Sequence, residues 1–174
     1  MCRDSWVLDA NVVKGIFDEA VGVPHGRTAS PTELVTRLRL DSLPIAVDGD
    51  EHIVAEWRNC VEPEWFEAWF FELTQSANVK VLDCAVEAPL LKRLRIECGL
   101  PPAENVWLIR TAVAAAKNYG TCTLVSEDAH LHHPACQKDP HLRARVLAGT
   151  VRGSVVSLMK KSHVCVRSID RAAD

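Results

Sequence analysis

The sequence predicts a three-layer α/β/α fold, in which helices cover both faces of a central, mainly parallel sheet. Short apolar runs of strand length alternate along the chain with longer segments of helical period. This alternation is typical of βαβ units, whose strands are parallel. With 174 residues, 48% of them hydrophobic and 25% charged, the chain is long and apolar enough to form one domain with a sizeable core.

The N-terminal half begins with a strand, Trp6–Leu8, that ends at the carboxylate of Asp9. A later helix opens at Ser30, because Ser30 can cap it, Pro31 suits its first turn and Glu33 completes a capping box. The other elements expected in this half are a helix at 12–21, a strand at 43–47 followed by the turn 48–50, helices around 53–57 and 62–73, and a strand at 79–82.

The C-terminal half is dominated by an alanine-rich helix from Glu104 to Tyr119, which closes at Gly120. The next strand, 121–126, is followed closely by a second acid, Asp128. We further expect a helix at 90–96, an irregular loop over 128–140, a helical turn at 143–148, and paired terminal strands at 155–158 and 164–166 with Lys160 and Lys161 in the turn between them.

Composition excludes several classes of protein. The formal net charge of −3 gives no overall attraction to nucleic acid or membranes, so a nucleic-acid partner needs a local basic patch. The sequence shows no signal peptide, in which a positively charged segment is followed by an apolar one. It also has no apolar run long enough to span a membrane. Its seven cysteines are odd in number and form no Cys-x-x-Cys pair, which is typical of reduced thiols. We therefore expect a cytoplasmic protein without a disulfide framework.

Four acidic residues fall at the ends of predicted elements: Asp9, Glu56, Glu104 and Asp128. Open parallel sheets bind ligands beyond the carboxyl ends of their strands, and three or four converging carboxylates suit Mg²⁺ or Mn²⁺. Such an ion can activate water and stabilise charge on a phosphate. Each acid alone has a structural explanation, as a helix cap, a solvated residue or a strand terminator, so the hypothesis depends on their joint placement. Asn11 could orient Asp9, and Ser126 could orient Asp128, through hydrogen bonds.

These segments resemble PIN-domain nucleases, and among them the toxins of type II toxin–antitoxin pairs. The matching pieces extend over roughly residues 4–132 and comprise Val7–Val12, Asp48–Trp57, the helix that starts at Glu104, and Leu124–Asp128. By this resemblance, Asp9, Glu56 and Asp128 take the acidic metal-site positions of the family, and Ser126 takes the place of its hydroxyl residue.

The resemblance also implies a fold and an activity. It implies a single PIN-like and Rossmann-like domain over residues 1–174, with a C-terminal extension from about residue 133. The implied activity is that of a Mg²⁺- or Mn²⁺-dependent endoribonuclease, which hydrolyses RNA phosphodiester bonds without a side-chain nucleophile. The toxin role implies a cognate antitoxin protein that covers the acidic residues.

The third acidic position departs from the family pattern. The family has an aspartate near the start of this helix, and the spacing to Ala112 puts Asn105 there, one residue after Glu104. An amide is a poorer ligand and brings no charge, so Asn105 in this position implies an impaired enzyme. The longer Glu104 side chain can reach the same point, and on this interpretation, which we favour, the metal site is intact.

The departure at Asn105 supports a rival hypothesis, a catalytically silent PIN-like module that binds RNA or a protein. A receiver-like phospho-acceptor fits less well, because its acid pair and strand-terminal lysine are not evident in the sequence.

For three further groups we favour a structural explanation. The run His130, His132 and His133 with Cys136 is better explained by a solvated loop than by zinc binding, because it lacks the second ligand pair of a zinc site. An aromatic group on two neighbouring helices is better explained by core packing or a homodimer face than by base stacking; it consists of Trp57, Trp65, Trp69, Phe70 and Phe71. Basic residues near the C-terminus could follow a phosphate backbone, but scattered surface charge explains most of them: Arg143, Arg145, Arg152, Lys160, Lys161 and Arg167.

Overall fold

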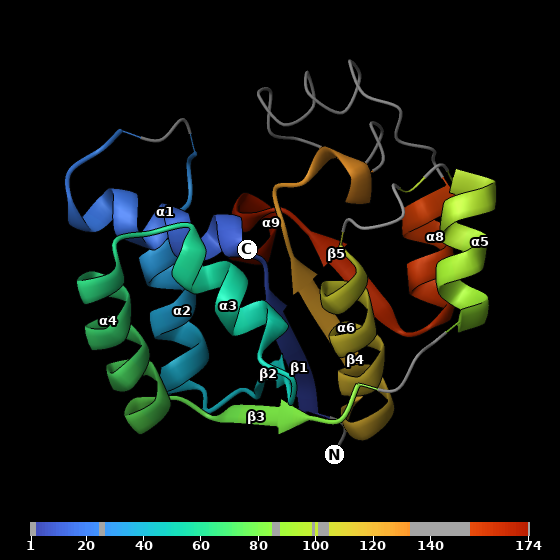
Figure 1. The fold of residues 1–174 in the computed structure, drawn as a ribbon, viewed down its shortest axis with the longest axis horizontal. Helices are drawn as coiled ribbons and strands as arrows, with labels where there is room; N and C mark the ends of the chain where they lie inside the picture. Colours follow the sequence, from blue (N-terminus) through green and yellow to red (C-terminus); the bar gives the residue numbers. More distant parts are fainter. Residues whose placement is uncertain are drawn as a thin grey trace.

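The computed structural model describes residues 3–24, 27–84, 88–98, 100, 105–132 and 154–173. Its centre is a five-stranded sheet with the order β3-β2-β1-β4-β5, in which all neighbouring strands are parallel (Figure 1). The strands are β1 (Arg3–Leu8), β2 (Ile45–Asp48), β3 (Val79–Leu82), β4 (Gly120–Val125) and β5 (Val164–Arg167). The predicted α/β class and parallel sheet are therefore confirmed.

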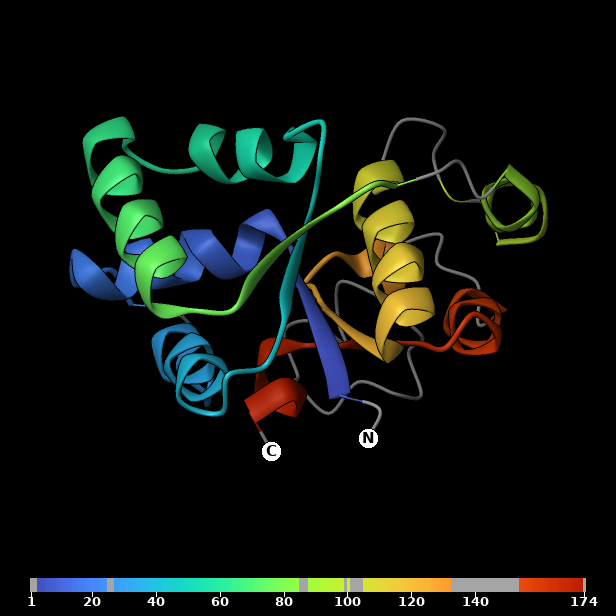
Figure 2. The same ribbon diagram turned by 90° about the horizontal axis from the view of Figure 1, so that it is seen from below.

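Helices cover both faces of this sheet (Figure 2). One face carries α1 (Ala10–Ala20), α2 (Pro31–Leu40), α3 (His52–Asn59) and α4 (Pro63–Ser76), and the other carries α5 (Ala88–Cys98), α6 (Val106–Tyr119) and α8 (Ser154–Lys161). The short helix α9 (Ile169–Ala173) follows β5 and packs against α2, where the Arg37 guanidinium donates to the carbonyls of Ala172 and Ala173.

The core is formed where α6 crosses the central strands. Leu8 of β1, Leu124 of β4 and Ile109 of α6 are fully buried there. Ala112 and Ala115 of α6 are also fully buried, and their small side chains let the helix lie close to the sheet. A parallel sheet covered on both faces needs continuous apolar strands, which is why the apolar runs of the sequence locate β1 and β4.

The capping prediction for α2 is confirmed. The Ser30 hydroxyl accepts a hydrogen bond from the Glu33 backbone N–H at 3.1 Å, and Pro31 occupies the first turn. The same hydroxyl donates to the Glu19 carboxylate at 3.0 Å, which ties the start of α2 to the last turn of α1.

The predicted pair of terminal strands is wrong. Residues 155–158 lie in α8, together with Lys160 and Lys161, and only the second segment is a strand, β5, which pairs in parallel with β4. The physical reason is periodicity. Val155, Leu158 and Met159 recur at i, i+3 and i+4 and are all buried, which is the pattern of a helix face rather than of a strand.

The remaining expectations concern the loop, the cysteines and the membrane. The loop after β4 begins with a short 3-10 helix, η1 (Ala129–Leu131), whereas its later part and the helical turn at 143–148 lie outside the described residues. No described helix is long and apolar enough to cross a membrane. The five cysteines of the described segments are free thiols: Cys60, Cys84, Cys98, Cys122 and Cys165.

Candidate active site

The carboxyl ends of β1 and β4 lie side by side at the centre of the sheet, and the chain leaves them toward opposite faces. β1 leads into α1, and β4 is followed by η1 and, next among the described elements, by α8 on the other face (Figures 1 and 2). Open parallel sheets bind ligands where the strand order diverges in this way. Asp9 directly follows β1, and Ser126 and Asp128 follow β4, so three predicted site residues lie at this point.

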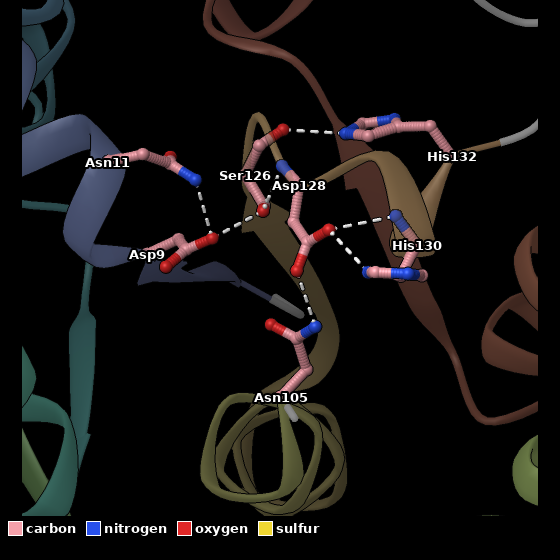
Figure 3. A network of polar contacts seen from close by, with 7 residues as sticks. All are labelled: Asp9, Asn11, Asn105, Ser126, Asp128, His130 and His132. Atoms are coloured by element: carbon pink, nitrogen blue, oxygen red, sulfur yellow. Dashed lines mark hydrogen bonds and ion pairs between the residues drawn. The ribbon is translucent and has the colours of Figure 1, made fainter. Parts of the chain in front are cut away.

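Ser126 connects the two aspartates. Its hydroxyl donates to Asp9 Oδ2 at 2.5 Å and accepts from the Asp128 backbone N–H at 2.9 Å (Figure 3). Asn11 supports the same carboxylate, because its Nδ2 donates to Asp9 Oδ2 at 2.7 Å while its Oδ1 accepts from the Glu127 N–H at 3.1 Å. The start of α1 and the segment after β4 therefore share one network, which orients the Asp9 carboxylate.

Asp128 faces the N-terminal end of α6. Asn105, the residue before this helix, donates from Nδ2 to Asp128 Oδ2 at 2.7 Å and has a left-handed backbone with φ of 57°. Asp128 Oδ1 accepts from the His130 backbone N–H at 2.8 Å and lies 3.1 Å from His130 Nδ1. Figure 3 shows the Asn105 amide and the carboxylates of Asp9 and Asp128 directed toward the same space. We call Asp9, Asp128 and the adjoining Asn105 the acidic group. Glu104 lies outside the described residues.

Glu56 approaches this group from α3. The residue is exposed as a whole, but its carboxyl is partly shielded from solvent, and this burial raises its pKa. The negative charges of Asp9 and Asp48 add to the rise, and His52 opposes it. Glu56 and Asp9 therefore lie within electrostatic range of each other.

The pKa of Asp9 is also raised, with burial as the largest cause, since the residue is only 7% exposed. Hydrogen bonds from Ser126 and from the Ala10 backbone lower it in part, the charge of Asp128 raises it further, and the hydrogen bond from Asn11 lowers it. The surroundings of Asp9 therefore disfavour its charged form, and a bound divalent cation would favour that form.

Mg²⁺ or Mn²⁺ fits the donors at this position. Among the described residues, no three His, Cys, Asp or Glu side chains are grouped closely enough to hold a metal ion by themselves. Mg²⁺ does not require such a group, because it keeps several waters and binds through one or two carboxylates. Asp9 and Asp128 supply two carboxylates and Asn105 an amide oxygen, which are the oxygen ligands that hard cations prefer.

Of the three predicted metal ligands that the structure describes, two are connected by hydrogen bonds. The structure brings Asp9 and Asp128 together through Ser126, and it leaves Glu56 in electrostatic range of Asp9 without a direct contact to either aspartate. The position of Glu104 stays a prediction.

The two described histidines of the 130–133 run have polar contacts within the site. His130 contacts Asp128, and His132, which is 1% exposed, donates from Nε2 to the Ser126 carbonyl at 2.6 Å. His133 and Cys136 lie outside the described residues, so the expectation that this run holds no structural zinc stays a prediction.

The aromatic group packs largely into the core and against itself. Trp57 is fully buried, and its Nε1 donates to the Leu8 carbonyl at 3.0 Å. Trp65 and Trp69 stack with ring centroids 5.6 Å apart. Phe71 is the exception, because 67% of its surface is exposed.

Two buried carboxylates near the site were not singled out from the sequence as site residues. Asp48, 1% exposed, accepts from the backbone N–H groups of His52 and Ile53 at 2.8 Å each and so caps α3. Glu127, 7% exposed, accepts from the Ile169 N–H at 2.8 Å at the start of α9. The position of Asp48 in the sequence, between a strand and a helix, is a recognisable signal that it caps α3. Nothing local links Glu127 to a helix 42 residues away.

Comparisons with known proteins give this chain no family. No protein-family model matches it, and neither a curated protein nor a solved structure matches it. A functional assignment therefore depends on the position of the site in the fold, its donor groups and its hydrogen bonds.

Proposed function

We propose that this protein is a Mg²⁺- or Mn²⁺-dependent endoribonuclease of the PIN type. The observation that carries the proposal is the connection of Asp9 and Asp128 through Ser126 at the point where the strand order diverges. The resemblance to PIN-domain nucleases assigns these three residues to the metal site and its hydroxyl position. A parallel sheet with helices on both faces is also the fold that this resemblance implies.

The chain supplies ligands and orientation for this chemistry. Asp9 and Asp128 would hold the ion, and the bound ion would lower the pKa of a water molecule and stabilise charge on the scissile phosphate. Ser126 positions both acids through its two hydrogen bonds. Asn105 orients Asp128 and offers its amide oxygen as a neutral ligand. Glu56 adds a negative charge that strengthens the attraction for a cation.

The proposal includes the biological role that the resemblance implies. In that role the protein is a cytoplasmic toxin that cuts RNA, and its partner is a cognate antitoxin protein. The acidic group provides binding partners for cationic side chains of such an antitoxin.

A second candidate function is a catalytically impaired module that binds RNA or a protein. The observation that favours it is the hydrogen bond from Asn105 to Asp128, because an amide occupies a place where a carboxylate would bind metal more strongly. The nuclease proposal therefore requires that Glu104 supplies the fourth acid or that the site functions with Asn105.

Cleavage of single-stranded RNA in Mn²⁺ distinguishes the two functions. The wild type should cut RNA, and Asp9→Asn and Glu104→Gln should abolish cutting, because each removes a charged ligand. Asn105→Asp should leave the rate equal or raise it. Asp41→Asn is the matched control, since Asp41 is an exposed residue at the end of α2. An inert wild type that Asn105→Asp rescues would instead favour the binding module.

A further inference from the structure

His52, Trp107 and Arg110 form a stack that joins the start of α3 to the first two turns of α6. The His52 and Trp107 rings have their centroids 3.8 Å apart and are inclined by 15°. The Arg110 guanidinium carbon lies 4.6 Å from the centroid of the Trp107 ring. We call these three residues the α3–α6 stack.

The stack adjoins the candidate active site from two directions. His52 lies one turn before Glu56 on α3 and is within electrostatic range of its carboxyl. Trp107 follows two residues after Asn105, which donates to Asp128 Oδ2. An RNA strand with one phosphate at the acidic group would therefore bring a neighbouring nucleotide near the stack.

Two properties of the stack exceed what the packing of two helices requires. His52 is exposed, and its ring makes no side-chain hydrogen bond to the described part of the chain. Arg110 Nε is buried and has no hydrogen-bond partner among the described residues. Apolar side chains could join α3 and α6 without the cost of desolvating a guanidinium N–H.

We propose that the α3–α6 stack binds one unpaired nucleotide of the RNA substrate, with the base on the His52 ring and the adjoining phosphate at Arg110. This inference rests on the proposed ribonuclease function. Unpaired RNA bases stack on histidine and other aromatic rings, and guanidinium groups pair with phosphate oxygens. Trp107 positions the other two side chains. Arg110 also supplies a local positive charge to a chain whose net charge of −3 repels RNA.

Fluorescence anisotropy with two labelled probes tests the base contact, in a chelating buffer that prevents metal-dependent cutting. One probe is a single-stranded RNA of about 12 nucleotides, and the other is a ribose-phosphate strand of equal length without bases. His52→Ala should weaken RNA binding about 10-fold, within the range of base stacking on aromatic side chains, and should leave the affinity for the abasic strand unchanged. His52→Phe should retain RNA binding, because it retains a ring.

The phosphate contact has a separate signature. Arg110→Gln should weaken binding of both probes and reduce the slope of log affinity against log salt concentration by about 0.7, the contribution of one phosphate contact on a single strand. His52→Leu is the matched control for helix packing, since it keeps an apolar side chain on Trp107 but has no ring. It should bind RNA as weakly as His52→Ala, with an unfolding temperature close to that of the wild type.

Equal RNA affinity of the wild type, His52→Ala and His52→Leu would overturn the proposal, and so would equal losses on both probes. These results are distinct from a failure of the nuclease function. A wild type that binds RNA through His52 but cuts nothing in Mn²⁺ supports the stack and refutes the nuclease. An active nuclease whose RNA affinity does not depend on His52 refutes the stack alone.

Discussion

Replacement of Asp9 by asparagine separates the stability of the metal-free protein from its response to metal. Burial raises the pKa of Asp9 in the folded state above the unfolded value. The contribution of this carboxyl to stability is therefore fully present below the unfolded-state pKa and is lost as the pH rises through the folded-state pKa. Above the unfolded-state pKa, this carboxyl therefore makes the metal-free protein less stable than a neutral side chain would. Because asparagine can still accept from Ser126 and Asn11, Asp9→Asn should be more stable than the wild type without metal.

Bound metal should reverse this order. A ligand at 100 times its Kd stabilises the folded state by about 2.7 kcal/mol, and in a chain of this length 1 kcal/mol corresponds to about 2–4 °C in Tm. Mn²⁺ at 100 times its Kd should therefore raise the Tm of the wild type by about 5–11 °C. Asp9→Asn should lose most of this rise, because it removes one of the two carboxylates that Ser126 connects. Its gain without metal should be about 1–3 kcal/mol, the scale for one unbalanced buried polar group.

Differential scanning fluorimetry of the wild type, Asp9→Asn and the control Asp41→Asn, in chelator and over a Mn²⁺ series, measures both effects. Repeating the metal-free series at lower pH should shrink the difference between wild type and Asp9→Asn, since a raised pKa destabilises the folded state less as the pH falls toward the unfolded-state pKa. An unchanged Mn²⁺ response in Asp9→Asn, or no response in the wild type, would refute the metal site. A metal-free Asp9→Asn that is less stable than the wild type at neutral pH would refute the electrostatic argument.

Three other substitutions can be checked in the same assay. Ser126→Ala removes the hydroxyl that Asp9 and Asp128 share, so it should lower stability by about 1–3 kcal/mol and Mn²⁺ affinity about 10- to 100-fold; an unaltered Mn²⁺ titration would contradict a positioning role. Glu127→Gln weakens the cap of α9, so it should cost about 1 kcal/mol with unchanged Mn²⁺ affinity, and a lost metal response would place Glu127 in the site. Asn105→Asp puts a carboxylate beside Asp128, so the metal-free protein should lose about 1–3 kcal/mol while Mn²⁺ binds more tightly; weaker Mn²⁺ binding would argue that Asn105 does not face the ion.

The central acids could be located from the sequence because the decisive information is local. An apolar run that stops at a polar residue marks the carboxyl end of a strand, and β1 and β4 both show this pattern before Asp9 and Ser126. Parallel pairing then sets Leu8 beside Val125. Once these two residues are aligned, the residues that follow each strand must lie close together.

Contacts between distant segments could not be predicted in this way. The approach of Asn105 to Asp128 depends on a left-handed backbone at Asn105, and the stack of His52 on Trp107 depends on how α3 sits beside α6. The helix α8 was missed for a related reason. The short run 155–158 suits a strand by itself, and its helical face becomes evident only with Met159 and with the packing that buries it.

Three buried acids lie near the carboxyl ends of the strands: Asp9, Asp48 and Glu127. They fall into two groups, and the difference between the groups bears on function. Asp48 and Glu127 accept hydrogen bonds from the first N–H groups of α3 and α9, so their charges stabilise helix ends. Asp9 also precedes a helix, yet burial and the charge of Asp128 raise its pKa despite hydrogen bonds from Ser126 and Asn11. A fold that needed only a helix cap there could use serine or asparagine without the cost of a buried charge. Such a cost is expected where a residue serves a ligand rather than the fold, so the acid that stabilises the chain least is the best candidate to bind a cation.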